Sequence, residues 1–302
     1  MEAHEAEQSK DRLAILAGGG SMPVEVAHSA KRSGQSVLVI DLASESDLTD
    51  LDASIPRNHI QWGQVGRLTK LLNGHQTDKL VIIGSISKRP DYSSVRPDWA
   101  GIQMLPRLVT TLLAGGDASV LDKVAGLVAD WGFTLVGAHE VAPDLVAQPG
   151  HIAGPQATDA LREDIKLAAK AAWTSGHLDM GQGAIAVSGR LVAMEGAEGT
   201  DGMVQRVGTM RNAGRFSSKG KVGALAKCTR PQQDLRLDMP AIGPRTIENV
   251  AAAGLAGVVV EAGRVLIGER EETIRRCAKL NVCLVAEARE TFVPEDSQDV
   301  PA

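Results

Sequence analysis

Residues 13–41, LAILAGGGSMPVEVAHSAKRSGQSVLVID, decide the fold class of this sequence. The apolar run 13–17 predicts a buried strand, the glycine-rich residues 18–23 predict a tight turn, and residues 24–33 predict a helix. A second apolar run, 36–41, predicts a strand parallel to the first. Together they predict a Rossmann-like βαβ unit that opens an α/β domain.

The turn in this unit suits a bound phosphate. Gly18, Gly19 and Gly20 let a ligand approach the backbone amides at the start of the helix. Asp41 ends the second strand, where a dinucleotide fold carries its ribose-binding acid, but Pro23 replaces the third glycine of the dinucleotide fingerprint. The unit therefore predicts nucleotide binding, with a nicotinamide-dependent reductase as one alternative function.

The composition is that of an ordinary globular protein with room for two domains. The chain has 302 residues, of which 43% are hydrophobic and only 3% aromatic, so Ala, Val, Leu and Ile must build the core. The charged N-terminus lacks the apolar stretch of a signal peptide, and the longest apolar run, 250–262, is too short to span a bilayer. These features predict a cytoplasmic protein. Three cysteines without metal-type spacing argue against structural zinc and disulfides.

Polar residues follow two further predicted strands in the N-terminal half. Arg89 and Asp91 follow the strand 80–83, at a position where open α/β sheets bind ligands; a simple connecting loop is the alternative. His139 follows the strand 133–137, either as a ligand or base or as a partly buried structural histidine. Helices are predicted at 103–113 and 119–131.

Proline and glycine recur from 144 to 158 with little periodicity, which predicts an interdomain linker. The linker separates a Rossmann-like N-terminal domain, 11–143, with a parallel sheet, from a C-terminal α/β domain, 159–290. The second domain contains a predicted β-hairpin at 184–194. The ends expected to be disordered are residues 1–10 and 291–302.

Three carboxylates follow the hairpin directly: Glu195, Glu198 and Asp201. One interpretation is that Thr200 or Asp201 caps a helix that begins near Gly202. The other is that the acids bind a hard cation such as Mg²⁺, with Gln182 reaching the same region.

The segment 224–246, ALAKCTRPQQDLRLDMPAIGPRT, concentrates ionisable side chains, among them Lys227, Arg230, Arg236 and Asp238. Arg236 and Asp238 alternate with apolar residues, so an extended chain would present both on one face. A helix is predicted to open at Thr246, and its free amides would attract anions. The segment predicts a phosphate-binding site, and a loop of solvated ion pairs is the alternative. Only one aromatic residue, Phe216, lies in the cationic stretch 202–233, which gives little support for nucleic-acid binding.

Five sequence runs carry a family resemblance: AGGGSMP at 17–23, SKRPD at 87–91, GAHEV at 137–141, LDMGQGAIAVSGRLVAMEGAEGTDGM at 178–203, and LAKCTRPQQDLRLDMPAIG at 225–243. The chain resembles the UDP-2,3-diacylglucosamine pyrophosphatases that are unrelated to calcineurin-like phosphoesterases. The resemblance extends from about residue 13 to residue 287.

This resemblance implies a cytoplasmic enzyme of lipid A synthesis that cleaves UDP-2,3-diacylglucosamine into UMP and 2,3-diacylglucosamine 1-phosphate, aided by Mg²⁺ or Mn²⁺. It implies a lipid-linked nucleotide sugar bound between two domains, with transient contact to the inner membrane; a homodimer is compatible with it. The family's Arg-x-Asp-x-Pro pattern falls on Asp238, which implies that this is the essential aspartate. A non-catalytic nucleotide-sugar or lipid-binding module is the remaining alternative.

Hydrolysis of a pyrophosphate requires charge neutralisation and a positioned water. We assign Asp238 to metal binding or water activation, with Arg236 and Lys227 as further catalytic residues, and Glu198 and Asp201 as further metal ligands. The residues expected to bind substrate are Gly18, Gly19, Gly20, Pro23, Arg89, Asp91, His139, Gln182, Thr200 and Arg230.

Overall fold

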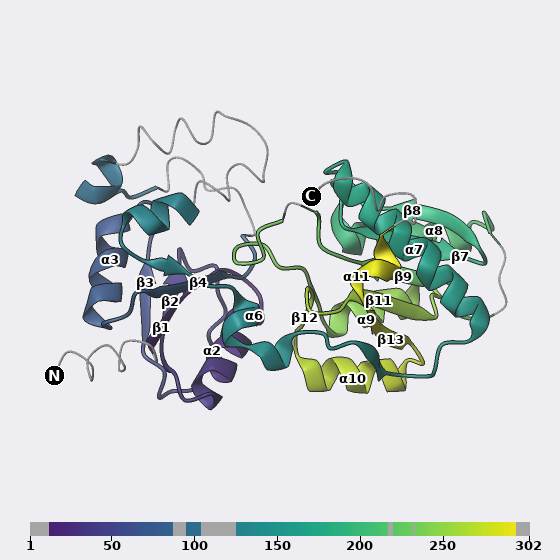
Figure 1. Ribbon diagram of the computed structural model, residues 1–302, viewed down its shortest axis with the longest axis horizontal. Helices are drawn as coiled ribbons and strands as arrows, with labels where there is room; N and C mark the ends of the chain where they lie inside the picture. Colours follow the sequence, from purple (N-terminus) through teal and green to yellow (C-terminus); the bar gives the residue numbers. More distant parts are fainter. Residues whose placement is uncertain (1–11, 87–94, 104–124, 217–219, 232, 294–302) are drawn as a thin grey trace. The chain divides into compact units, whose positions relative to one another are not determined.

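The computed structural model describes residues 12–86, 95–103, 125–216, 220–231 and 233–293 (Figure 1). The chain divides into two compact units. Unit 1 comprises Met1–Asp144 and the short segment Asp234–Asp238, and unit 2 comprises Leu145–Gln233 and Met239–Ala302. Both units combine helices with a β-sheet, which confirms the predicted two-domain α/β class.

Unit 1 is built on a parallel five-stranded sheet in the order β3-β2-β1-β4-β5. The strands are β1 Arg12–Ala17, β2 Ser36–Leu42, β3 Arg57–Ile60, β4 Lys79–Ile83 and β5 Thr134–Leu135. Because β1 pairs with both β2 and β4, the strand order reverses beside β1, as in a Rossmann fold. The Rossmann-like prediction is confirmed. The edge strand β3 escaped prediction because its sequence, RNHI, has no apolar run.

The helices of unit 1 follow from simple sequence signals. Helix α2, Met22–Arg32, has Pro23 in its first turn, where a backbone N–H has no helical partner. Its buried face includes Val26, Ala27 and Ala30. Helix α3 spans Val65–Gly74, and the short α6 spans Ala138–Val141. The helices predicted at 103–113 and 119–131 lie mostly outside the described residues.

Unit 2 contains a six-stranded sheet in the order β6-β13-β11-β9-β7-β8. The strands are β6 Gly150–Ala153, β7 Gly183–Val187, β8 Arg190–Met194, β9 Ala224–Lys227, β11 Gly257–Glu261 and β13 Cys283–Glu287. The central strands β9, β11 and β13 are parallel, whereas β6, β7 and β8 pair antiparallel with their neighbours. The predicted hairpin is therefore confirmed as β7 and β8.

Alternating side chains give the sheet of unit 2 two buried faces. Helix α7, Asp159–His177, covers a face lined by alanines such as Ala184 and Ala226, and its own Ala168 and Ala172 are buried against it. Small residues on both sides permit close packing. The larger Ile185 and Leu225 point to the other face. That face is covered by α8 Gly199–Asn212, α9 Pro244–Ala252 and α10 Arg270–Lys279.

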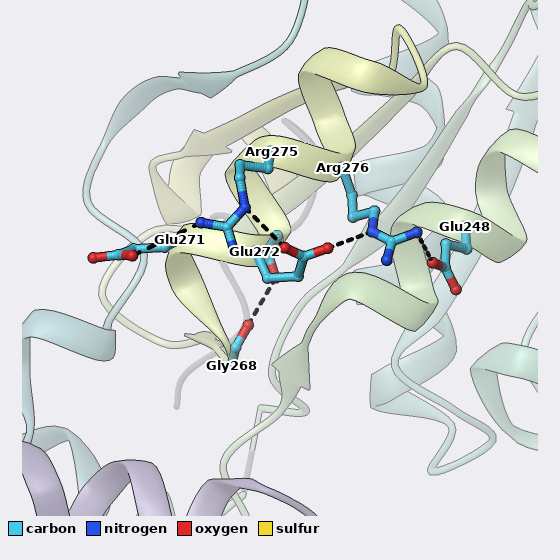
Figure 2. A network of polar contacts seen from close by, with 7 residues as sticks. Glu248, Gly268, Glu271, Glu272, Arg275 and Arg276 are labelled. Atoms are coloured by element: carbon cyan, nitrogen blue, oxygen red, sulfur yellow. Dashed lines mark hydrogen bonds and ion pairs between the residues drawn. The ribbon is translucent and has the colours of Figure 1, made fainter.

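Helices α9 and α10 are joined by a network of ion pairs (Figure 2). Arg276 of α10 contacts Glu272 of its own helix and Glu248 of α9, and Arg275 contacts Glu272 at 2.6 Å. Thr273 donates its hydroxyl to the carbonyl of Gly268 at 2.7 Å. These contacts hold α10 beside the two-stranded sheet of β10 Ala241–Ile242 and β12 Leu266–Ile267.

Two predictions about chain ends and linkers were wrong. The predicted linker 144–158 contains β6, which pairs with β13, so its prolines and glycines flank an edge strand rather than a free connection. The predicted tail, starting at 291, begins too early. Helix α11, Arg289–Phe292, ends in a fully buried Phe292 that packs on the α7 face.

Within the described ranges, no helix combines the length and apolarity needed to cross a membrane.

Candidate active site

Charged side chains gather where the parallel strands of unit 2 end. Lys227 ends β9 and Glu261 ends the neighbouring β11. Strand β7 runs antiparallel to β9, so Gly183 at its start pairs with Lys227. We call Gly183, Glu195, Lys227, Thr229 and Glu261 the charged edge of unit 2. Ligands of open α/β sheets bind at this end of the strands.

Glu261 is a fully buried carboxylate, and both of its oxygens are bound. Thr229 donates its backbone N–H at 2.9 Å and its hydroxyl at 2.6 Å to Oε2. Arg289 donates to Oε1 at 2.9 Å. A buried charge is tolerated when it is paired and hydrogen-bonded in this way. The contacts fix the loop that follows β9.

Glu195 is a second buried carboxylate, and within the described residues only one of its oxygens has a partner. Oε1 accepts the Thr200 hydroxyl at 3.1 Å, whereas Oε2 has no hydrogen-bond partner among the described residues. A Cβ added to Gly183 would lie 2.6 Å from Oε2, so this glycine makes room for the carboxylate. Gly183 pairs with Lys227, and directly paired residues point to the same face of a sheet, so the Glu195 carboxylate beside Gly183 lies on the face of Lys227.

The two predicted cations of this region are held differently. Lys227 is half-buried and donates from Nζ to the carbonyl of Ala241 at 2.9 Å. Arg230 donates from Nη1 to Asp179 at 2.8 Å. Gln182, the third predicted ligand here, accepts the backbone N–H of Cys228 at its own carbonyl, and its Oε1 is buried without a partner in the described part of the chain.

The acidic cluster belongs to the start of α8. The helix begins at Gly199, with Glu198 in the capping position and without a side-chain cap, so the predicted cap at Thr200 or Asp201 and the start near Gly202 were wrong. Thr200 turns to Glu195 instead. Gly199, at the first position of the helix, has a φ of 73°, a conformation that favours glycine.

Both predicted metal ligands of this cluster are paired with arginine. Glu198 contacts Arg206 at 2.6 Å, which lowers the pKa of its carboxyl group. Asp201 accepts hydrogen bonds from Arg245 and from Asn249, each at 3.0 Å. Across residues 12–86, 95–103, 125–216, 220–231 and 233–293, no three His, Cys, Asp or Glu side chains are grouped as metal ligands.

The segment Asp234–Asp238 forms a turn, so the predicted extended strand with Arg236 and Asp238 on one face was wrong. The Asp234 carbonyl accepts the backbone N–H of Leu237 and that of Asp238, at 3.1 and 2.9 Å. The Asp234 carboxylate accepts the backbone N–H of Arg236, a local bond that competes with strand pairing.

This turn belongs to unit 1, where Leu237 packs on the core. Arg236 donates from Nε and Nη2 to Asp234, and this pairing is the main reason that the pKa of Asp234 is lowered. The charge of His139 lowers it further. Asp238 is half-buried at the end of the turn. The predicted catalytic residues are thus divided between the units, with Asp238 and Arg236 in unit 1 and Lys227 in unit 2.

His139 lies in the first turn of α6, and its Nδ1 is buried without a hydrogen-bond partner within the described residues. The ring occupies the space beside Gly137, where an added Cβ would lie 2.3 Å from Cε1. The GAHEV run therefore needs its glycine to seat the histidine.

The glycine-rich turn of unit 1 is joined to the end of β4. Gly18 donates its N–H to Ile83 at 2.8 Å, and Gly19 and Ser85 exchange backbone hydrogen bonds of 2.6 and 2.8 Å. The N–H groups of Gly18 and Gly19, which were predicted to bind phosphate, are therefore already hydrogen-bonded, and Pro23 has no N–H to donate. Gly20, with a φ of 92° and open space around it, remains accessible. Arg89 and Asp91 lie outside the described residues.

Asp41 does not present a free carboxylate to a ribose. Ser46 donates its N–H and its hydroxyl to Oδ1, at 3.2 and 2.6 Å, and His59 lies 2.9 Å from Oδ2. This arrangement does not favour the reductase alternative, in which Asp41 would bind the cofactor.

Sequence reasoning did not select Glu261 as a site residue, and it named Glu195 only as one of three acids that could bind a cation. Glu261 was visible as the single acid in the apolar run 250–262, because a lone charge at the end of a buried strand requires a partner. No sequence signal separates Glu195 from its neighbours Glu198 and Asp201, since only the fold buries Glu195 and leaves Asp201 half-buried and Glu198 exposed.

Two family models match almost the whole chain. The LpxI N-terminal domain matches residues 12–145, and the LpxI C-terminal domain matches residues 148–285. The boundary between the matches coincides with the division between the two units after Asp144.

A curated relative supports the same family. The UDP-2,3-diacylglucosamine pyrophosphatase LpxI of Caulobacter vibrioides is 37% identical over 263 residues, which cover 87% of this chain and 92% of the relative. Among solved structures, the Bordetella bronchiseptica enzyme WbmH in complex with NAD⁺ matches 28% of this chain and 30% of its own, at 19% identity and a TM-score of 0.23. That similarity is too low to support a functional argument.

Proposed function

We propose a function from one premise: this chain belongs to the LpxI family, whose two domain models it matches from residue 12 to residue 285. The protein hydrolyses the pyrophosphate bond of UDP-2,3-diacylglucosamine in lipid A biosynthesis. Water adds across the bond between the two phosphates, so the products are UMP and 2,3-diacylglucosamine 1-phosphate. The observation that carries this conclusion is the 37% identity over 92% of the curated relative.

The chemistry requires an acid–base group and cations near the phosphates. Asp238 is our candidate for orienting or deprotonating the attacking water, on the basis of its place in the Arg-x-Asp-x-Pro pattern. Lys227 and Arg230 are our candidates for neutralising phosphate charge, because both lie at or next to the charged edge. Arg236 is held by hydrogen bonds from Nε and Nη2 to the Asp234 carboxylate and therefore has a fixed orientation.

The direct test is release of UMP from UDP-2,3-diacylglucosamine by the purified full chain. The wild type should release UMP, and Asp238→Asn should reduce kcat by about 10²- to 10⁴-fold, the usual contribution of a positioned acid–base group. Wild-type protein that does not hydrolyse this substrate would overturn the proposed function. A variant that retains activity within a few-fold would overturn only the role of Asp238.

Asp234→Asn is a matched control in the same turn. It changes the same kind of side chain, four residues away, but its carboxylate is occupied by Arg236. We expect it to raise KM more than it lowers kcat, because it loosens a cation without removing the acid–base group. If both variants lost kcat equally, the turn as a whole would be required rather than Asp238.

We further propose that the reaction uses Mg²⁺ or Mn²⁺. Such ions need only one or two carboxylates in addition to phosphate oxygens, and Glu198, Asp201 and Asp238 are the candidate ligands. Glu198 and Asp201 are bound to Arg206 and Arg245, so a cation must displace an arginine to reach them. The bound cation would neutralise phosphate charge.

This proposal has two readouts. Excess EDTA should abolish UMP release, and Mn²⁺ should restore it. In the absence of substrate, Glu198→Gln and Asp201→Asn should weaken Mn²⁺ binding measured by electron paramagnetic resonance. Full hydrolysis by metal-free protein would remove the cation from the reaction.

The place of the enzyme in the cell is also a proposal. Its substrate carries two acyl chains and a charged nucleotide, so we place the enzyme in the cytoplasm in transient contact with the inner membrane. Sedimentation with inner-membrane vesicles in the presence and absence of substrate tests this location.

A further inference from the structure

An apolar tip follows the last turn of α7 in unit 2. Leu178 is 69% exposed and Met180 is 51% exposed, although large apolar side chains gain stability when they are buried. Leu178, Asp179 and Met180 form what we call the tip. We infer that the tip binds an acyl chain of the lipid substrate, an inference that rests on the proposed function.

The tip is held in one conformation by its own backbone. Leu178 and Met180 donate their N–H groups to the carbonyl of Ser175, at 3.2 and 3.1 Å, and Asp179 donates to Gly176 at 3.1 Å. Asp179 has a φ of 52°, a left-handed conformation that Asp adopts more readily than most other residues.

An ion pair connects the tip to a phosphate-binding candidate. Arg230 donates from Nη1 to the Asp179 carboxylate at 2.8 Å, and the Arg230 Cα lies 3.4 Å from the position that a Cβ at Gly176 would take. The end of α7 therefore packs directly against the arginine. A cation beside an apolar surface matches a ligand with an anionic phosphate and apolar chains.

The tip is also continuous with the charged edge. Gly181 follows Met180, and a Cβ there would lie 2.5 Å from the carbonyl oxygen of Glu195. The chain then passes through Gln182 into Gly183, which pairs with Lys227. A ligand whose phosphates lie at the charged edge can therefore extend its acyl chain over Leu178 and Met180 of the same unit.

The test is the double variant Leu178→Ser/Met180→Ser in the full chain, assayed on substrate in mixed detergent micelles. We expect KM to rise by about tenfold or more with kcat nearly unchanged, because apolar contact made equally in the ground and transition states affects only KM. The inhibition constant of UDP, which has no acyl chain, should not change.

Leu191→Ser is the matched control. Leu191 is also exposed, at 42%, but lies beside the turn of the β7–β8 hairpin, at the opposite end of β8 from Glu195. Its substitution should leave KM unchanged. A series of substrates with shorter acyl chains gives a readout that a structural role would not affect, because the difference in KM between wild type and double variant should shrink as the chains shorten.

The outcomes are distinct. Failure of the wild type to release UMP would refute the proposed function. An active wild type with an unchanged KM in the double variant would overturn the acyl-chain site. If the double variant instead lost only its binding to substrate-free vesicles of anionic phospholipid, the tip would be a membrane contact, and the inference would be wrong.

Discussion

The carboxyl edges of the two sheets offer a ligand different chemistry. In unit 1 the edge is made of backbone: Gly18 and Gly19 are bonded to Ile83 and Ser85, and Asp41 at the end of β2 is bound to its neighbours. In unit 2 the edge is made of charged side chains that include Lys227 and the two buried carboxylates Glu195 and Glu261.

This difference determines which substitutions each edge tolerates. At Gly18 and Gly84 the unit 1 edge has no room for added atoms, because the two glycine segments touch through their main chains. The unit 2 edge contains buried carboxylates, one of which is paired with Arg289, so it is sensitive to loss of a charge. Adding a methyl group should therefore damage the first edge, and removing a carboxylate should damage the second.

The largest effect on stability should come from Glu261→Ala. This change leaves Arg289 and the Thr229 N–H without their partner and opens a cavity below the charged edge. Breaking one side of a buried ion pair costs about 3–5 kcal/mol of unfolding free energy. Hydrogen exchange followed by mass spectrometry measures the two units separately. The protection free energy of the slowest amides in unit 2 should fall by this amount, while that of unit 1 should not change.

Glu271→Ala is the control for this change. Glu271 has the same side chain, is 94% exposed, and lies 3.9 Å from its partner Arg275. Exposed ion pairs contribute little, so the unfolding free energy should change by less than about 0.5 kcal/mol. Equal effects of the two substitutions would mean that the buried network does not stabilise unit 2.

A smaller effect is expected from Gly84→Ala in unit 1. Gly84 has a φ of 108°, and an added Cβ would lie 2.6 Å from the carbonyl carbon of Gly18. The backbone strain should cost about 1–2 kcal/mol, and displacing the Gly18 main chain should add about 1–3 kcal/mol. The unfolding free energy of unit 1, again from hydrogen exchange, measures the sum.

Gly20→Ala separates the two contributions. Gly20 has a similar φ of 92°, but an added Cβ would have no atom within 4 Å. It should therefore show only the strain of about 1–2 kcal/mol. If Gly84→Ala were no more costly than Gly20→Ala, the contact between the two glycine segments would not constrain unit 1.

The sequence predicted the elements that are governed by local patterns. Apolar runs identified β1, β2, β4, β11 and β13, and the turn Ser188-Gly189 identified the hairpin of unit 2. It failed where a single side chain overrides the pattern. Alternation in 234–239 predicts a strand, but the Asp234 carboxylate binds the Arg236 N–H and closes a turn. Burial of Phe292 likewise orders residues that are polar by composition.

The candidate site was only partly predictable. The sequence indicated Lys227 and Arg230 in one segment and Gln182 and Thr200 near the acidic cluster, and unit 2 holds all four. It did not indicate that Asp238 and Arg236 belong to unit 1. The segment Asp234–Asp238 returns to unit 1, and no residue pattern in the sequence signals such a return. Nor did it separate Glu195 from Glu198 and Asp201, since their different partners come from tertiary packing.

The smallest expected contribution to the free energy of unfolding at neutral pH comes from the cysteines. All three lie in unit 2 and are fully buried. Burial, followed by the charge of Glu261, raises the pKa of Cys228 to about 12, because both disfavour a thiolate. Burial also raises the pKa of Cys277 to about 12. A raised folded pKa gives stability that is complete below the unfolded value of 9.0 and is lost as pH rises towards 12.

At pH 8.5, alkylation by iodoacetamide should therefore be at least ~10²-fold slower in the native protein than in urea, since the thiolate is the reactive form. Mass spectrometry of each cysteine peptide measures these rates. Native labelling of Cys228 at the rate seen in urea would mean that the charged edge is open to water, and that its carboxylates are no more buried than the acids of unit 1.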